Sequence, residues 1–254
     1  MENKPTFNDI ENYSEIVEEN DFFIQFTNTD IPTHYESNYL LLKFSPSLEE
    51  FKLIEKMHRD YQKSIQQNHL KMNWPENVGL HPELLNYFNQ QNYKLGMQSL
   101  YWVTPDSIKV KTLNQDLSMQ QVTNQNFKNF LKMNLEEDQL YGEPFLNQQK
   151  RMYPYQFQLE NTTFILAYLK GEPVGSLILI HSEEFLEVDH VLTKAEYRGN
   201  NIAATMLDYV VNEFTNKEPF IILVADAEDT PKKMYEKMGF QTNAYQISAQ
   251  KFIQ

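Results

Sequence analysis

The sequence of 254 residues predicts an α/β fold, with a mixed, mostly antiparallel sheet flanked by helices and arranged in two similar halves. Three observations support this fold class. Short apolar and aromatic runs, typical of strands, alternate with longer stretches of helical periodicity. Between residues 164 and 180 a strand, a Lys-Gly-Glu-Pro turn and a second strand follow one another, as in an antiparallel hairpin. The order strand, helix, strand, short helix, strand in 21–102 resembles a shortened version of the unit that ends the chain.

Apolar and aromatic runs predict the strands of the N-terminal half, at 22–26, 39–44 and 93–103. Helical spacing of apolar residues predicts a long helix at 47–68 and a short one at 82–91. Ser47 with Glu50 three residues later is the pattern of a capping box, and Pro82 suits the first turn of a helix. This half is therefore expected to hold a small sheet covered by two helices.

The polar segment 104–119 marks the predicted boundary between a domain at 1–113 and a second domain at 114–254. It holds no long flexible linker, so we expect the two halves to pack closely. Gly239 suits the left-handed position that ends a helix. Helices are predicted at 124–138, 144–152, 201–216 and 231–238, and strands at 164–169, 174–180, 185–192, 220–225 and 245–253.

The chain contains no cysteine, which excludes disulfides, thiolate metal sites and an acyl-cysteine intermediate. Its formal net charge is −13, with 10 basic against 16 acidic residues up to Gln115 and 12 against 19 after it. Neither half offers the positive field that a nucleic-acid backbone requires. The acidic surface is compatible with a cationic substrate and equally with simple solubility.

Targeting and metal signals are missing from the sequence. There is no signal segment at the start, and no apolar run approaches the roughly 20 residues that span a bilayer. No histidine and carboxylate pair has metal-site spacing. We therefore expect a cytoplasmic protein with no metal and with neither a membrane nor a nucleic acid as partner.

The segment from Arg198 to Ala203 links a strand that ends near Thr193 to a helix that opens near Asn201. Helix N-termini carry unpaired N–H groups and a partial positive charge, so such a turn suits a pyrophosphate. The small side chains of Ala203 and Ala204 would let a ligand approach the first helical turn. On spacing alone, an ordinary strand–helix connection explains the segment equally well.

At this turn the sequence resembles the GCN5-related N-acetyltransferase (GNAT) family, whose signature is Gln/Arg-x-x-Gly-x-Gly/Ala. Residues 196–203, Glu-Tyr-Arg-Gly-Asn-Asn-Ile-Ala, occupy it, with Arg198 in the first position and Ala203 in the last. Asn201 replaces the usual middle glycine. Asparagine tolerates left-handed geometry better than other non-glycine residues, so we expect a weakened rather than an abolished phosphate cradle.

A second motif strengthens the resemblance. Residues 231–240, Pro-Lys-Lys-Met-Tyr-Glu-Lys-Met-Gly-Phe, are similar to the family's late helix, which typically reads Leu-Tyr-Glu-Lys-Leu-Gly-Phe. The two motifs occur in the family's order, separated by an apolar strand, which is more specific than either alone. The resemblance covers about Val122 to Gln254 and implies an acyl-CoA N-acyltransferase-like fold.

The resemblance implies acetyl-CoA as acyl donor and assigns roles to particular residues. Tyr235 corresponds to the tyrosine that protonates the leaving coenzyme A thiolate in many members. The strand before the turn would contact the acyl carbonyl and the pantetheine arm through Val191, Leu192 and Thr193. The turn would hold the pyrophosphate through Arg198, Gly199, Asn200, Asn201, Ile202 and Ala203.

The same strand often carries a carboxylate base in the family, and here Glu187 is the first candidate and Asp189 the second. Strand alternation would place both on one face with Val191 and Thr193, and would point His190 the other way as a packing histidine. The alternative for the two carboxylates is a solvated face of an edge-like strand. The alternative for a tyrosine on a short helix is an ordinary core aromatic.

The N-terminal half resembles a degenerate tandem copy of the same unit. Residues 88–93, Phe-Asn-Gln-Gln-Asn-Tyr, can be laid on Tyr235 to Phe240, and Phe88 then has no hydroxyl at the tyrosine position. Nothing in this half resembles the phosphate turn, so we expect it not to bind coenzyme A but to enclose the acceptor site and cover a sheet edge. The alternative is an unrelated α+β domain.

These features predict an N-acetyltransferase that moves an acetyl group from acetyl-CoA to a primary amine of a small molecule by direct attack. One alternative is a non-catalytic acyl-CoA-binding or scaffold protein, because of Asn201 and the missing second site. Another is a tRNA-dependent aminoacyltransferase, against which the acidic halves argue. The sequence leaves the acceptor and the oligomeric state open.

Overall fold

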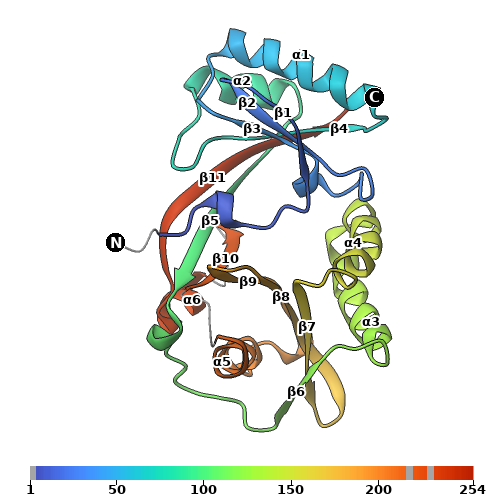
Figure 1. Ribbon diagram of the computed structural model, residues 1–254, viewed down its shortest axis with the longest axis vertical. Coiled ribbons are helices and arrows are strands. Elements are labelled where there is room, and N and C mark those ends of the chain that lie inside the picture. The colour runs from blue at the N-terminus through green and yellow to red at the C-terminus, as the bar shows by residue number, and fades with distance from the viewer. Residues whose placement is uncertain (1–3, 216–219, 228–231, 254) are drawn as a thin grey trace.

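The computed structural model describes residues 4–215, 220–227 and 232–253, and in this part of the chain eleven strands form one continuous sheet (Figure 1). Their order across the sheet is β1-β2-β3-β4-β11-β5-β10-β9-β8-β7-β6. The pairs β3–β4 and β9–β10 are parallel and the others antiparallel. The first half contributes β1 (Glu15–Glu19), β2 (Phe23–Thr27), β3 (Leu40–Leu42), β4 (His69–Asn73) and β5 (Lys94–Val103). The second half contributes β6 (Leu117–Gln121), β7 (Thr162–Leu169), β8 (Glu172–His181), β9 (Phe185–Thr193), β10 (Phe220–Asp226) and β11 (Gln241–Phe252).

Helices cover both faces of the sheet, which confirms the predicted α/β fold class. The α-helices are α1 (Leu48–Ser64), α2 (Pro82–Gln90), α3 (Phe127–Asp138), α4 (Glu143–Gln156), α5 (Ile202–Phe214) and α6 (Lys232–Met238). Short 3₁₀ helices occur at Phe7–Asp9, Tyr35–Ser37, Pro105–Ser107, Gln139–Tyr141 and Ala195–Tyr197. Within the described ranges, no helix combines the length and the apolar character needed to cross a bilayer.

The last strand of each half is exchanged with the other half. β11 lies between β4 and β5, and β5 lies between β11 and β10, so each half's penultimate strand pairs with the last strand of the other. The two exchanged strands also pair with each other, from Gln241 opposite Trp102 to Gln250 opposite Lys94. The predicted domain boundary between residues 113 and 114 stays a prediction. In space, each half is completed by a strand from the other.

The two halves repeat one another in their order of elements. β3, α1, β4, α2 and β5 correspond to β9, α5, β10, α6 and β11, and in each half the first and third of these elements pair in parallel. The two short helices also end alike. The N–H of the last residue bonds to the C=O of the first in both 88–93 (2.9 Å) and 235–240 (3.0 Å). The preceding residues, Asn92 and Gly239, have positive φ angles of 56° and 101°.

The core of the second half lies on both faces of its strands. On β7, Ile165 and Ala167 pack with α5 and α6, whereas Phe164 and Leu166 pack with α3 and α4. Burial on both faces explains why these strands are almost wholly apolar. The β7–β8 hairpin was predicted, and its turn has positive φ at both Lys170 and Gly171, as tight hairpins prefer.

Two strands, β1 and β6, were not predicted, and β4 was expected between the two helices of the first half without bounds. β1 is exposed along its whole length and rich in glutamate, and β6 is polar, so neither edge strand has the apolar pattern by which strands are recognised. α1 ends at Ser64 rather than near residue 68, and β4 follows it. Pro231, the predicted start of the last helix, lies outside the described residues.

Gly239 ends α6 in a conformation that only glycine adopts without strain, and this end positions the helix that carries Tyr235. A Cβ at this residue would lie 2.7 Å from the carbonyl oxygen of Ser107. We therefore expect Gly239→Ala to lower the free energy of unfolding by about 1–3 kcal/mol, measured by urea denaturation. The matched control is Gly79→Ala, because a Cβ at Gly79 meets nothing within 4 Å and its φ is not positive. Equal stabilities of the two variants would contradict this account.

Candidate functional site

The parallel strands β9 and β10 separate part of the way along their length. Their register runs from Phe185 opposite Phe220 to Glu187 opposite Ile222 and ends there. Beyond this point β9 continues along β8 as far as Thr193, while β10 continues along β5 as far as Asp226. The facing edges of the two strands therefore have backbone groups that the sheet does not pair. Such an opening accepts an extended ligand that bonds to backbone groups.

A β-bulge in β9 changes which side chains share a face. Asp189 lies opposite Ile178 and Leu192 opposite Ser176, so two residues of β9, His190 and Val191, face a single residue of β8. His190 adopts a left-handed φ of 49°. The prediction of regular alternation is therefore wrong beyond Asp189. Val191 packs in the core with α5, and His190 lines the same cavity as Asp189.

The turn before α5 has the geometry of an anion site. Asn201 is left-handed (φ 58°, ψ 23°), which is the conformation for which asparagine substitutes for glycine. Its side chain makes no capping hydrogen bond, and the first turn of α5 contains no acidic residue. The first N–H groups of a helix have no acceptor within the helix, so these donors and the positive end of the dipole remain available to an anion. Gly199 has φ 82°, and a Cβ built there would meet open space.

Neighbouring elements hold this turn in place. The guanidinium of Arg198 donates from Nε to the carbonyl of Thr193 at 3.3 Å and lies 3.8 Å from the carboxylate of Glu137 on α3. Asn114, in the segment before β6, donates to the carbonyl of Asn200 at 3.1 Å. The strand and the helix thus hold Arg198, whose side chain is largely exposed, and the loop before β6 holds the neighbouring Asn200.

Tyr235 lies in the core of the second half. It is buried on α6, and its ring centroid is 5.7 Å from that of Tyr101 on β5 and 5.5 Å from that of Phe240. The same cluster includes Val188 and Leu223, which lie on β9 and β10 just beyond the end of their pairing. Tyr235 thus belongs to the side-chain layer beneath the opening, and its role in catalysis stays a prediction.

A cavity of about 730 Å³ lies between the two halves. Its walls come from the N-terminal segment, α4 and the strands β4, β5 and β11. Glu187, Asp189 and His190 of β9 line it together with Val224 of β10, so the cavity reaches the place where the two strands separate. A volume of this size is within the range of small-molecule sites.

Glu187 is a buried carboxyl with few compensating contacts. One carboxylate oxygen accepts the backbone N–H of Glu11 at 2.9 Å. Burial raises the pKa of Glu187 well above its ordinary value, the nearby charge of Asp189 raises it further, and the N–H bond opposes both. A carboxyl with a raised pKa is suited to exchange protons near neutral pH. Asp189 accepts a long hydrogen bond from Gln156 at 3.4 Å.

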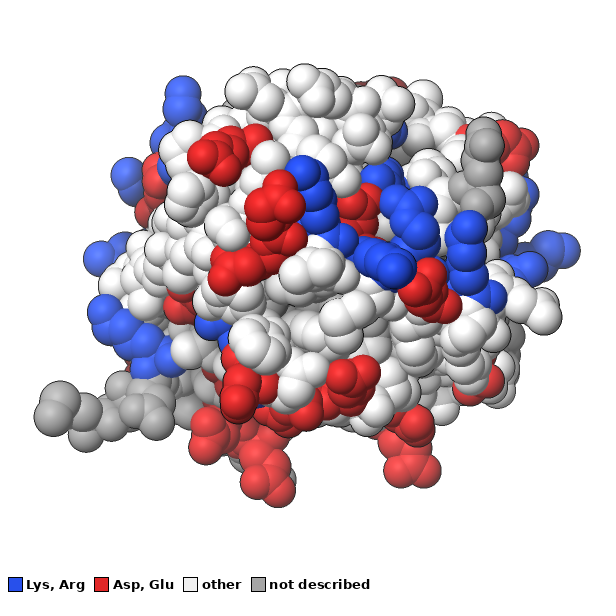
Figure 2. Space-filling view, turned by 90° about the horizontal axis from the view of Figure 1, so that it is seen from above, with Lys and Arg blue, Asp and Glu red and all other residues white. Residues whose placement is uncertain are grey.

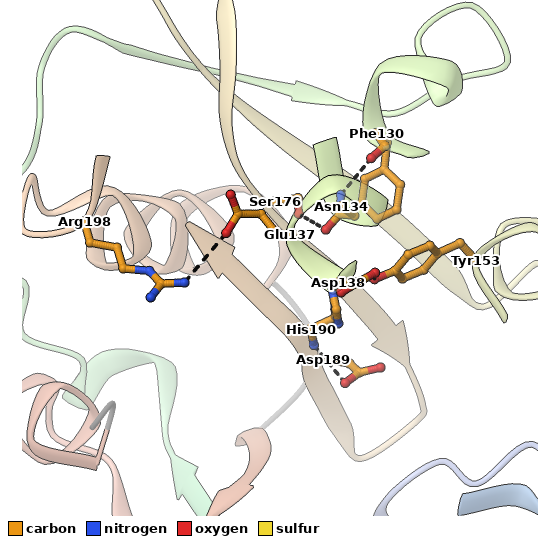
Figure 3. A network of polar contacts seen from close by, with 9 residues as sticks. All are labelled: Phe130, Asn134, Glu137, Asp138, Tyr153, Ser176, Asp189, His190 and Arg198. Atoms are coloured by element: carbon orange, nitrogen blue, oxygen red, sulfur yellow. Dashed lines mark hydrogen bonds and ion pairs between the residues drawn. The ribbon is translucent and has the colours of Figure 1, made fainter. Parts of the chain in front are cut away.

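His190 belongs to a hydrogen-bonded chain with two residues from the helices beside β9 (Figure 3). The hydroxyl of Tyr153 donates to Asp138 at 2.7 Å and lies 2.7 Å from Nε2 of His190. A hydroxyl has one hydrogen, so Tyr153 accepts from His190, and Nε2 carries the ring proton. In the neutral form of the ring the lone pair is then on Nδ1. Burial raises the pKa of Asp138, and the neighbouring His190 and Tyr153 oppose this.

His190, Tyr153 and Asp138 were not predicted to act as a unit, because a bulge and two helices bring them together. The Asp189-His190 pair was visible as a polar interruption of an apolar strand, but strand alternation assigned the histidine to the wrong face. No group of metal-binding side chains was found among the described residues.

In the first half, the start of α1 corresponds to the start of α5, and it is capped by side chains. α1 begins with a capping box in which Ser47 and Glu50 bond each other's backbone N–H groups, and Glu49 and Glu50 place negative charge in the first turn. The space between α1 and α2 is filled by an aromatic cluster with ring centroids 5.0–6.0 Å apart, made of Phe51, Trp74, Phe88 and Tyr93. The capping box already uses the N–H groups of Ser47 and Glu50, and the carboxylates of this turn would repel a pyrophosphate.

Comparisons with known proteins match two parts of the chain to two different family models. Residues 114–251 match the family model described as an acetyltransferase (GNAT) domain, and residues 6–101 match a domain of unknown function (DUF5613). The family predicted from the two C-terminal motifs is thereby confirmed. No curated protein matches the sequence.

Solved structures share the fold over most of the chain. A functionally unknown conserved protein from Staphylococcus epidermidis ATCC 12228 superposes with a TM-score of 0.90 at 22% identity, covering 98% of each chain. A GCN5-related N-acetyltransferase from Kribbella flavida gives 0.62 at 13% identity, covering 90% of this chain and 86% of that one. The tandem GNAT protein from the clavulanic acid biosynthesis pathway gives 0.54 at 9% identity, with coverages of 84% and 75%. At these identities the likeness shows the fold.

Replacing Glu187 by glutamine is expected to change how stability depends on pH. A raised folded-state pKa means that the folded protein holds a proton that the unfolded chain has lost. The contribution of Glu187 to the free energy of unfolding is therefore fully present below the pKa that it has in the unfolded chain. It is lost as pH rises toward the pKa that it has in the folded protein. We expect Glu187→Gln to gain stability relative to wild type across this window, with a slope of up to about 1.4 kcal/mol per pH unit in urea denaturation. Glu184→Gln on the exposed turn is the control. A pH-independent difference for Glu187→Gln would contradict the raised pKa.

Proposed function

The chain belongs to the acetyltransferase (GNAT) family, and on that premise we propose that it transfers an acetyl group from acetyl-CoA to a primary amine of a small molecule. The observation that carries this proposal is the separation of β9 from β10 beside the uncapped N-terminus of α5. The two features are adjacent, and together they fit one ligand that has a hydrogen-bonding arm and an anionic group. An acyl-CoA has both.

The residues of this half fit such a donor. The N–H groups at the start of α5, from Asn201 to Ala203, would bind the pyrophosphate. The free edge of β9 would bind the pantetheine arm. Thr193 supports this assignment, because its hydroxyl oxygen is buried and has no hydrogen-bond partner among the described residues. Buried hydroxyls are normally paired, so a ligand that reaches β9 would satisfy it.

On the other side of the sheet, the cavity between the halves would hold the acceptor. Glu187 is the first candidate to take the proton from the attacking amine, directly or through water, because its pKa is raised and it lines the cavity. Asp189 and His190 lie beside it. His190 offers Nδ1 as a second acceptor, with its ring held by Tyr153.

The transfer step balances with these groups. The amine nitrogen forms a bond to the acyl carbon, the carbon–sulfur bond breaks, and the sulfur leaves as a thiolate. The base on β9 takes the proton that the nitrogen loses. Tyr235 would give the proton that the sulfur takes up. The chain has no cysteine, so direct attack rather than a thioester intermediate on the protein is proposed.

A binding or scaffold protein without turnover is the second candidate. Asn201 in place of glycine motivates it, and so does the burial of Tyr235 among core aromatics. The left-handed conformation of Asn201 removes part of this objection, because the turn keeps the shape that the glycine would give it.

A tRNA-dependent aminoacyltransferase is less consistent with the surface. On the face seen in Figure 2, basic side chains lie interleaved with acidic ones. Opposite charges side by side cancel at a distance and leave no field that would steer a polyanion. The net charge of −13 has the same consequence.

Tyr235→Phe tests the proposed reaction. We expect wild type to release free thiol from acetyl-CoA when a primary amine is present, and the variant to do so about 100-fold more slowly, because the leaving sulfur loses its acid. Affinity for acetyl-CoA, measured by calorimetry, should change little. The readout is thiol release followed with a thiol-reactive dye.

Tyr209→Phe on α5 is the matched control, since it removes a hydroxyl from a partly buried tyrosine of the same core cluster. Equal rates for wild type and Tyr235→Phe would remove this tyrosine from the mechanism. Tight binding of acetyl-CoA without thiol release for any amine would favour the scaffold function.

A further inference from the structure

The cavity between the halves is lined by side-chain amides that lack partners. Gln148 and Gln149 on α4 line it and are 7% and 8% exposed, and their amides form no hydrogen bond to any described residue. The side chains are mostly buried, but their amide groups open into the cavity. A ligand in the cavity that both donates and accepts hydrogen bonds can therefore bond to them.

The floor of the cavity has the same chemistry. It is formed by the exchanged strands, where Gln98 of β5 lies directly opposite Gln246 of β11. Asn73 on β4 donates to Gln246 at 3.2 Å, while the oxygen of its own amide is buried without a partner. Gln250 continues the row along β11. Amides thus face the cavity from two sides, the strands and α4.

Away from β9 the cavity is lined by paired or neutral groups and by two charged side chains, Glu11 and Lys94, that have no ion-pair partner among the described residues. Among the described residues, Glu36 forms an ion pair with Lys71, and Lys251 forms one with Glu55. His34 accompanies them, and burial lowers its pKa to about 4, so that it is neutral at physiological pH. The remaining cation on this wall is Lys94, which has no ion-pair partner among the described residues. The cavity carboxylates without an ion-pair partner among the described residues are Glu11, Glu187 and Asp189. They lie close together at β9, so a chain of positive charges would find no row of carboxylates along the cavity.

Aromatic rings complete the lining at the mouth. Tyr35 and Phe252 lie edge to face with centroids 5.7 Å apart, and Tyr141 and Phe145 form a tilted pair at 5.4 Å. Tyr141 and Phe252 are largely exposed. Apolar ring faces beside neutral amides match a ligand that has C–H faces and a polar rim.

We propose that the acceptor is a hydroxyl-rich amine of the amino-sugar class. Its amino group would lie against Glu187 and Asp189, its hydroxyl groups would bond Gln148, Gln149 and Asn73, and its ring faces would pack on the aromatic side chains. Hydroxyl groups both donate and accept, as the free amides require. This inference rests on the proposed function, and it names the acceptor of that reaction.

The test compares two amines of similar ring size, D-glucosamine and cyclohexylamine, of which only the first has hydroxyl groups. Calorimetry in slightly acidic buffer, where both amines are protonated, measures binding without any acyl donor. We expect glucosamine to bind at least about tenfold more tightly than cyclohexylamine. Gln148→Met and Gln149→Met should each weaken glucosamine binding about threefold to tenfold and leave cyclohexylamine binding unchanged. Gln90→Met, exposed at the end of α2 and outside the cavity, is the matched control.

The outcomes separate this inference from the proposed function. Equal affinities for the two amines, or tighter binding of spermidine than of glucosamine, would overturn the amino-sugar assignment. If both glutamine variants fold poorly, the comparison of the two amines on wild type still decides. Glucosamine binding without thiol release would keep this inference and refute the proposed reaction. Thiol release with cyclohexylamine or spermidine but not with glucosamine would support the proposed reaction and refute the amino-sugar assignment.

Discussion

The pairing of β5 with β11 is the contact on which the rest of the molecule depends. Each strand ends one half of the chain, and each lies beside the penultimate strand of the other half, so neither half has a complete sheet without its partner. Backbone groups of a central strand must be paired, so the exchange ties the stability of the two halves together. The same pair of strands forms the floor of the cavity. An acceptor site between the halves is therefore a direct result of the topology.

The two halves share this framework and differ in chemistry at the equivalent helix N-termini. Ser47 and Glu50 close the start of α1 with a reciprocal cap, whereas Asn201 leaves the start of α5 open. Phe51 and Trp74 fill the space beside α1. The first half thus repeats the order of elements of the second half, but the start of its helix is capped. Its part in the proposed reaction is to enclose the acceptor, through the N-terminal segment and β4.

Much of the fold could be predicted from local patterns, because buried strands and capped helices have recognisable sequence patterns. The left-handed residue at position 201 could also be anticipated, since asparagine tolerates that conformation. The strand exchange could not, because no local pattern says which half a terminal strand joins. The bulge at His190 was equally hidden: one extra residue moves the histidine to the face of Asp189. The amides of the cavity belong to α4, β4, β5 and β11, which are far apart in the sequence. That they line one cavity could be seen only in the structure.

We infer that the chain holds one acyl-CoA site, at the start of α5. Calorimetric titration of wild type and of Ala203→Glu with acetyl-CoA tests whether this site exists. A carboxylate in the first turn favours the helix itself but repels a pyrophosphate at the same donors. We expect one site per chain in wild type and an affinity for acetyl-CoA at least about tenfold weaker in the variant. Two sites per chain, no binding to wild type, or equal affinity of the two proteins would contradict it.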